Sequence, residues 1–158
     1  MKVSVIGLGY IGLPTAAILA ARQVVVIGVD VNQHMVDTIN QGRIHIVEPE
    51  LDTLVRGAVQ AGYLRAVTQP EKADAFMVAV PTPFKGNYEP DLSYIESASK
   101  AIAPVLEKGN MVILESTSPV GTTEKMIGWM QEVRPDLVFP VFGEDGSDAD
   151  ISVAHCPE

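Results

Sequence analysis

Short apolar runs alternate along the chain with longer segments in which apolar residues recur at helical spacing. Residues 3–6 form a β-branched run that ends at Gly7, and the small and apolar residues 11–21 that follow predict a helix after a glycine turn. A second apolar run, residues 24–29, ends at Asp30. Runs that are apolar throughout are typical of strands covered by helices on both faces, so the pattern predicts a parallel sheet.

The same alternation continues along the rest of the chain. Further strands are expected at residues 64–67, 75–80, 111–114, 137–141 and 151–154, and further helices at residues 32–40, 48–61, 92–106 and 121–133. Strands that alternate with helices in this way indicate an α/β fold with a doubly wound, mainly parallel sheet, helices on both faces and right-handed crossovers. We expect residues 1–158 to form one domain.

A Gly-Leu-Gly-Tyr-Ile-Gly segment begins at Gly7, directly after the first predicted strand and at the start of the first helix. In this context Gly7 permits a tight turn, Gly9 lets a pyrophosphate approach the backbone, and Gly12 allows close helix packing. The helix N-terminus adds free N–H groups and a positive dipole end. We therefore expect a dinucleotide site here, to which Tyr10 and Ile11 also contribute. The alternative is that the glycines serve only a tight turn.

Asp30 ends the second strand, at the place where a carboxylate accepts hydrogen bonds from the adenosine ribose in a Rossmann fold. A 2′-phosphate would be repelled by this carboxylate, and the following Val-Asn-Gln supplies no arginine to receive it. The sequence therefore predicts NAD as the cofactor. In the alternative interpretation, Asp30 only caps the next helix.

Two later strands also end in polar loops, which a parallel sheet brings to the same edge. Thr82, in a Pro-Thr-Pro stretch, can bond a cofactor hydroxyl or the dinucleotide backbone, although such a turn can also be a mere connection. Ser116 and Thr117 follow the next strand and can face the nicotinamide. Thr123 belongs to a group of hydroxyls that either reach the cofactor or cap the following helix.

Composition and charge narrow the classes of partner. Hydrophobic residues make up 47% of the chain, charged residues 20%, and the net charge is −9, which disfavours nucleic acid and anionic membranes. The only cysteine, Cys156, cannot form an internal disulfide, and we expect a buried structural thiol. The chain shows no signal peptide, and its apolar runs are shorter than the roughly 20 residues of a membrane span, so a cytoplasmic location is expected. The histidines, His34, His45 and His155, lack metal-ligand spacing, so we expect no metal.

Four segments together resemble the UDP-glucose/GDP-mannose dehydrogenase family, and the resemblance runs essentially end to end. The segments are residues 4–14 (SVIGLGYIGLP), 44–49 (IHIVEP), 80–86 (VPTPFKG) and 114–121 (LESTSPVG). The resemblance implies an NAD-dependent, four-electron oxidation of the C6 alcohol of a nucleotide sugar, through an aldehyde and a cysteine-bound thioester that is then hydrolysed. The product would serve polysaccharide biosynthesis.

The resemblance also assigns roles to single residues. By the family pattern Thr117 and Glu158 lie near the reacting carbon, where a hydroxyl and a carboxylate help to position water. The linking helix, the sugar-nucleotide domain and the nucleophilic cysteine of the family have no counterpart in this sequence, so Cys156 is not expected to be that nucleophile. We expect the chain to bind NAD, to meet a UDP-sugar only together with the missing domain, and to belong to a homo-oligomer. A hydroxyacid-type dehydrogenase domain and a stand-alone NAD-binding or sensing module are the alternatives.

Overall fold

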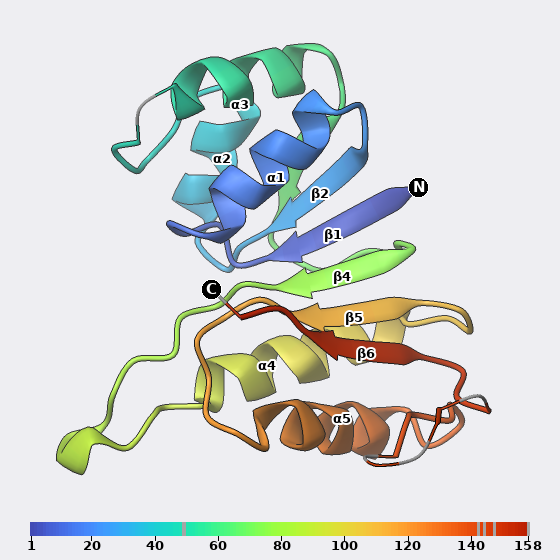
Figure 1. The fold of residues 1–158 in the computed structure, drawn as a ribbon. Helices are drawn as coiled ribbons and strands as arrows, with labels where there is room; N and C mark the ends of the chain where they lie inside the picture. Colours follow the sequence, from blue (N-terminus) through green and yellow to red (C-terminus); the bar gives the residue numbers. More distant parts are fainter. Residues whose placement is uncertain (49, 142, 144, 147, 158) are drawn as a thin grey trace.

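The computed structural model describes every residue of the chain except 49, 142, 144, 147 and 158 (Figure 1). A six-stranded sheet has the order β3-β2-β1-β4-β5-β6, and all of its strand pairs are parallel. The strands are β1 Lys2–Ile6, β2 Val25–Val29, β3 Leu64–Val67, β4 Ala75–Val78, β5 Met111–Leu114 and β6 Ser152–His155. Because the chain starts in the centre and winds outward in both directions, the predicted doubly wound Rossmann sheet is confirmed.

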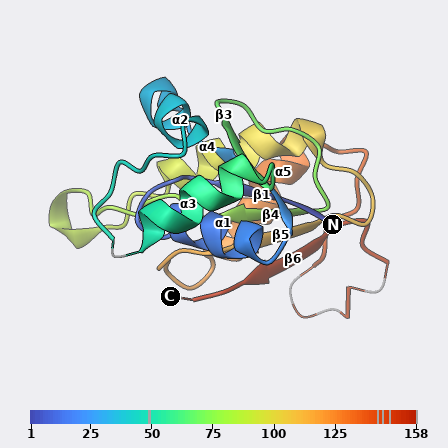
Figure 2. The ribbon, with the colours of Figure 1, turned by 90° about the horizontal axis from the view of Figure 1, so that it is seen from above.

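Helices connect the strands and cover the two faces of the sheet. They are α1 Gly12–Ala21, α2 Gln33–Asn40, α3 Leu51–Gln60, α4 Ser93–Ile102 and α5 Thr122–Val133, with short 3-10 helices η1 Gly86–Tyr88 and η2 Ala103–Val105. The first three helices pack on the half of the sheet that contains β1–β3, whereas α4 and α5 lie on the opposite face of the other half (Figures 1 and 2). None of the helices in the described part of the chain is long and apolar enough to cross a membrane.

The alternation of side chains along the strands produces two apolar cores, one on each face of the sheet. Val3 and Val5 of β1 pack with α1 and α3, while Phe76 and Val78 of β4 pack with α4 and α5 on the other face. All four side chains are less than 5% exposed. Residues 3–6 of β1 are therefore buried throughout, as the run predicted for a strand covered on both faces.

One predicted strand is wrong. In residues 137–141 the side chains of Leu137 and Phe139 are buried and Val138 is exposed, which is the burial pattern of a strand. The backbone, however, bonds to a loop: the Val138 amide donates to the carboxylate of Asp150, and the Val138 carbonyl accepts from the Asp150 amide. The segment packs on the core without joining the sheet, and the edge position belongs to β6.

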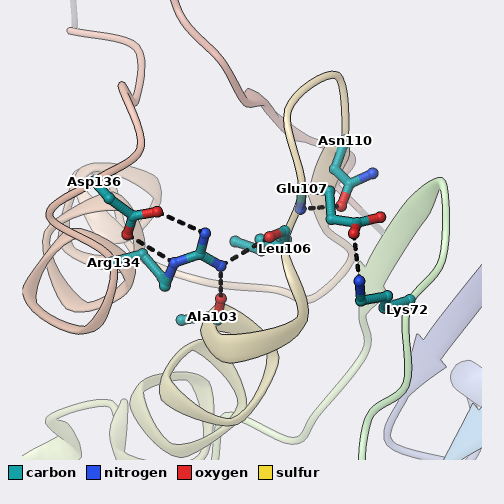
Figure 3. Close-up of polar contacts among 7 residues, drawn as sticks. All are labelled: Lys72, Ala103, Leu106, Glu107, Asn110, Arg134 and Asp136. Carbon is teal, nitrogen blue, oxygen red and sulfur yellow. Dashed lines mark hydrogen bonds and ion pairs between the residues drawn. The ribbon is translucent and has the colours of Figure 1, made fainter.

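The predicted helix at residues 92–106 is divided in two. α4 ends at Ile102 and the 3-10 turn η2 follows, because Pro104 has no N–H with which to continue the α-helical ladder. Arg134, which follows α5, donates Nη1 to the carbonyls of Ala103 and Leu106 in this turn (Figure 3). The same guanidinium pairs with Asp136 through two hydrogen bonds, both of 2.8 Å. The polar contacts of one arginine thus join the ends of α4 and α5.

Candidate functional site

A cleft of about 430 Å³ opens at the carboxyl edge of the sheet, where β1, β4 and β5 end. Most of the residues predicted from the sequence line it, from the four segments that follow β1, β2, β4 and β5: Gly7, Gly9, Tyr10, Ile11, Asp30, Thr82, Ser116 and Thr117. Met35, Ala79, Val80 and Pro81 complete the lining. The parallel topology therefore brings together residues that are more than a hundred positions apart, as the sequence predicted.

The three motif glycines have different surroundings. A Cβ on Gly7, whose φ is +91°, would lie 2.8 Å from the carbonyl oxygen of Ala79. A Cβ on Gly12 would lie only 1.8 Å from the carbonyl oxygen of Gly7, so Gly12 is fixed by packing and lies behind the cleft. A Cβ on Gly9, in contrast, would meet no atom within 4 Å. The open space above Gly9, at the N-terminus of α1, is suited to a pyrophosphate.

The Asp30 carboxylate joins two loops at the bottom of the cleft. Its Oδ2 accepts a hydrogen bond of 3.0 Å from the Leu8 amide, and its Oδ1 accepts one of 2.9 Å from the Asn32 amide. The residue that caps α2 is Asn32, whose side chain accepts from the amides of His34 and Met35. The helix-cap interpretation of Asp30 therefore loses its basis, and its oxygens keep lone pairs for a ribose hydroxyl.

The side chain of Leu8 is an anchor that sequence reasoning missed. Leu8 is fully buried, and a Cβ on Gly28 of β2 would lie 2.9 Å from both of its methyl groups. Gly28 thus leaves the space that Leu8 fills. The sequence did contain a signal for this contact: a glycine inside an otherwise β-branched strand often marks a place where another group packs closely against the backbone.

The loops after β4 and β5 are joined to each other at the cleft. The Thr82 hydroxyl donates a hydrogen bond of 2.6 Å to the carbonyl of Thr117. Ser116 is 4% exposed, and its Oγ has no hydrogen-bond partner among the described residues. A buried hydroxyl without a partner costs free energy, so the Ser116 side chain fits a polar group of a bound ligand.

A second pocket, of about 340 Å³, adjoins the cleft and shares Gly7, Asp30 and Pro81 with it. Its other walls are mainly apolar and come from β2 and α4, including Val29 and Ala98. The sequence analysis did not find this pocket, because its walls combine buried residues such as Val29 with exposed ones such as Tyr94, from elements far apart in the chain.

Other predicted residues lie elsewhere. Thr123 lines a separate hollow beside β6, together with His155. No side chain caps the N-terminus of α5, so Thr123 does not have the predicted capping role either. The buried hydroxyl of Thr122 instead donates to the carbonyl of Pro119. Cys156 is exposed, which corrects the expected buried thiol: it lies just beyond the edge strand β6, which no further strand covers among the described residues. The predicted catalytic residue Glu158 lies outside the described residues.

A contact between α1 and the loop after β5 was also missed. The Thr15 hydroxyl donates a hydrogen bond of 3.3 Å to Oε1 of Glu115, across 100 positions of sequence. No spacing rule predicts such a pair. Within the part of the chain that the structure describes, no group of three or more histidine, cysteine or acidic residues could hold a metal ion.

Comparisons with known proteins identify the family. Residues 1–158 match the sequence profile of the UDP-glucose/GDP-mannose dehydrogenase family, NAD binding domain. The chain is 68% identical over 156 residues to an NDP-N-acetyl-D-galactosaminuronic acid dehydrogenase of Ralstonia nicotianae, covering 99% of this chain and 36% of that protein. It is 65% identical over 156 residues to the UDP-N-acetyl-D-mannosamine dehydrogenase of Escherichia coli K12, covering 99% and 37%.

Solved structures of nucleotide-sugar dehydrogenases are also similar to this chain. UDP-D-ManNAc dehydrogenase of Pyrococcus horikoshii superposes with a TM-score of 0.89 at 37% identity, over 100% of this chain and 36% of the other. GDP-mannose dehydrogenase of Pseudomonas aeruginosa gives a TM-score of 0.86 at 34% identity, over 100% and 36%. The chain thus spans little more than a third of the length of its relatives. It belongs to the UDP-glucose/GDP-mannose dehydrogenase family and corresponds to the NAD-binding domain of that family.

Proposed function

We propose that the chain is the NAD-binding part of a nucleotide-sugar 6-dehydrogenase. The substrate is UDP-N-acetylmannosamine, or a related UDP- or GDP-sugar, which is oxidised to its uronate in two NAD-dependent steps. Two relatives of 65% and 68% identity carry names that refer to N-acetylated hexosamine derivatives, which supports this choice. The structural observation that carries the proposal is the cleft in which the open glycine loop, Asp30 and the β4 and β5 loops meet.

The residues of the cleft fit the parts of NAD in order. The loop at Gly9 and the N-terminus of α1 hold the pyrophosphate, and Asp30 accepts from the adenosine ribose. The apolar pocket beside Asp30 suits the adenine ring. Ser116 and Thr82, at the ends of β5 and β4, serve the nicotinamide half. When bound, NAD supplies a hydride acceptor, and the protein supplies binding and orientation.

Thr117 and Glu158 are the residues that we propose to act beside the reacting carbon. Thr117 lines the cleft, and its loop is held by the hydrogen bond from Thr82 to the Thr117 carbonyl. A hydroxyl there can orient a water molecule, and a carboxylate can accept its proton. Thr123, in the hollow beside β6, is proposed as a further cofactor residue.

The isolated chain is proposed to bind NAD without oxidising the sugar. The groups that hold the sugar nucleotide and the thiol nucleophile are assigned to the part of the relatives that this chain does not match, which is nearly two thirds of their length. A homo-oligomeric enzyme, a cytoplasmic location and a role in polysaccharide biosynthesis are further parts of the proposal. A stand-alone NAD-binding module is the second candidate, because the cleft that the NAD site needs is built from residues of this chain alone.

The test combines binding with turnover. Calorimetric titration of the chain with NAD+ and NADP+ measures cofactor choice. NADH formation from UDP-N-acetylmannosamine, followed at about 340 nm, measures activity of the chain alone and of a chimera in which it replaces the equivalent part of the E. coli enzyme. We expect NAD binding by both proteins and turnover by the chimera only. Robust turnover by the isolated chain, lost in Cys156→Ser, would contradict the assignment of the nucleophile to the missing part.

A further inference from the structure

No helix of the described residues covers one face of the sheet over β5 and β6. On the side of α4 and α5, Val112 and Leu114 of β5 are completely buried. On the opposite side, Met111 is 43% exposed and Ile113 is half-buried, although both belong to a strand that is paired on each side. In the view of Figure 1 no described helix lies in front of β5 and β6. Parallel sheets are normally covered on both faces, so this face lacks a layer.

Helix α1, which packs on β1 and β2 and contacts the loop after β5 through Thr15, is apolar on its outer side as well. Its inner residues, such as Leu13 and Ala17, are completely buried, yet Ile18 is 53% exposed and no charged residue occurs within the helix. A helix at the surface of a globular protein normally carries polar residues on its outer face. An apolar outer face is instead typical of a helix that is packed on both sides.

The contact between Thr15 and Glu115 connects these two observations. Thr15 and Ile18 are three positions apart and share one stripe of α1. Because Thr15 reaches Glu115 at the end of β5, this stripe is turned toward β4 and β5. Met77 of β4, half-buried, lies beside Ile113 of β5 in the strand register, and β4 separates β5 from β1. Ile18, Met77, Met111, Ile113 and the exposed Ala154 of β6 therefore belong to one side of the molecule, which we call the bare face.

We infer that the bare face is the docking surface for an apolar helix from the part of the dehydrogenase relatives that this sequence does not match. The inference rests on the proposed function, because it assumes that this chain acts together with a part like the unmatched part of the dehydrogenase relatives. The relatives offer nearly two thirds of their length as a source of such a helix. A helix is the usual cover of a parallel sheet. A second copy of the chain is disfavoured because each copy has a net charge of −9.

The first experiment maps the face by chemical labelling. In a Cys156→Ser background, which leaves no other thiol in residues 1–158, Met111→Cys is compared with Gln131→Cys on the exposed side of α5, and the label at each position is quantified by peptide mass spectrometry so that thiols of the rest of the chimera do not contribute. The rate of maleimide labelling is measured in the isolated chain and in the chimera with the E. coli enzyme. We expect the thiol at position 111 to react about tenfold or more slowly in the chimera, because labelling then needs local opening. The thiol at position 131 should react equally in both.

Two results would overturn the inference. Equal labelling at position 111 in the isolated chain and in a chimera that binds NAD would show that nothing covers the face. Labelling that slows in the isolated chain as its concentration rises would assign the face to a second copy. NADH formation by the chimera is a separate measurement, so protection without turnover would reject the proposed substrate and keep the docking surface.

The second experiment needs only the chain as it is. The double variant Ile18→Lys/Met111→Lys places two charges on the bare face, and Val47→Lys, at a residue 91% exposed in the loop before α3, is the matched control. Binding of the dye ANS reports exposed apolar surface. We expect the double variant to lose most of the ANS signal while the affinity for NAD is unchanged, and the control to retain the signal. An equal signal in both variants would mean that the bare face is not a continuous apolar surface.

Discussion

The backbone amide of Leu8 donates a hydrogen bond of 3.0 Å to the carboxylate of Asp30. The glycine loop after β1 and the end of β2 are thereby joined through one side chain, which also accepts from the Asn32 amide. Asp30 consequently has two tasks, which are to hold the loop and to face the cleft. Substitutions at this position have to be designed so that the two effects can be told apart.

Asp30→Ala is expected to weaken NAD binding by about 10- to 100-fold, the range for a lost hydrogen bond to a charged group. The affinity for NADP should change less, because the repulsion of the 2′-phosphate is removed at the same time. Asp30→Asn is the control, since it keeps one acceptor for the loop and removes the charge. Calorimetry of the unaltered protein and the two variants with both cofactors measures the six affinities. Equal affinities of the unaltered protein for NAD and NADP would contradict the role of Asp30.

Gly9→Val should abolish NAD binding and leave the fold intact. The new side chain would occupy the open space above Gly9, where the pyrophosphate is proposed to lie, and no protein atom lies within 4 Å of its Cβ. Gly12→Ala is the contrasting variant, because its Cβ would lie 1.8 Å from the Gly7 carbonyl and the fold itself must shift. Circular dichroism and thermal unfolding separate the two cases. Unchanged NAD affinity in a folded Gly9→Val protein would show that the loop is only a turn.

Two buried serines allow a matched comparison. The hydroxyl of Ser4, in the middle of β1, and that of Ser116, at the cleft, both lack a described hydrogen-bond partner. Ser4→Ala should raise the free energy of unfolding by about 1 kcal/mol, or Tm by about 2–4 °C, because it removes an unpaired polar group from the core. NAD affinity should not change.

Ser116→Ala should stabilise the protein without cofactor to a similar extent but weaken NAD binding by about three- to tenfold, the effect of one lost neutral hydrogen bond. Thermal unfolding with and without NAD measures both quantities. If Ser116→Ala binds NAD as tightly as the unaltered protein, its hydroxyl is not part of the cofactor site.

The pKa of Asp91, before α4, is lowered from 3.8 to about 2, first by hydrogen bonds from the Ser93 hydroxyl and amide and then by Lys85. Since the folded form binds the proton less readily than the unfolded form, this carboxylate stabilises the protein above about pH 4. The contribution is lost as the pH falls through 2. NMR titration of the carboxyl carbon checks the value, and Ser93→Ala should raise this pKa more than Lys85→Ala. An unshifted Asp91 in the unaltered protein would contradict the assigned contacts.

The sequence alone predicted the position of those cleft residues that depend on local patterns. Gly7, Gly9 and Asp30 were predicted because a glycine turn and a strand end impose a fixed geometry, and the alternation of elements brought Thr82 and Ser116 to the same edge. The strand predicted at residues 137–141 failed because alternating burial does not reveal which backbone groups are available as partners.

The contacts that were missed join residues that no periodicity relates. The hydrogen bond from Thr15 to Glu115 spans 100 positions, and the pocket beside Asp30 combines residues of α4 and β2 with the loop after β3. Whether an apolar residue such as Met111 is covered depends on the layers above its strand, which the strand's own sequence does not encode.

The burial of Leu8 against Gly28 has a consequence for the energetics of cofactor binding. Many loops that hold phosphates become ordered only when the ligand arrives, and the ligand then has to offset the lost conformational entropy. Here the central side chain of the glycine loop is part of the core of β1, β2 and α1, so the backbone at the proposed pyrophosphate position is fixed by packing of the protein itself. Binding of NAD therefore does not have to offset the conformational entropy of ordering this loop.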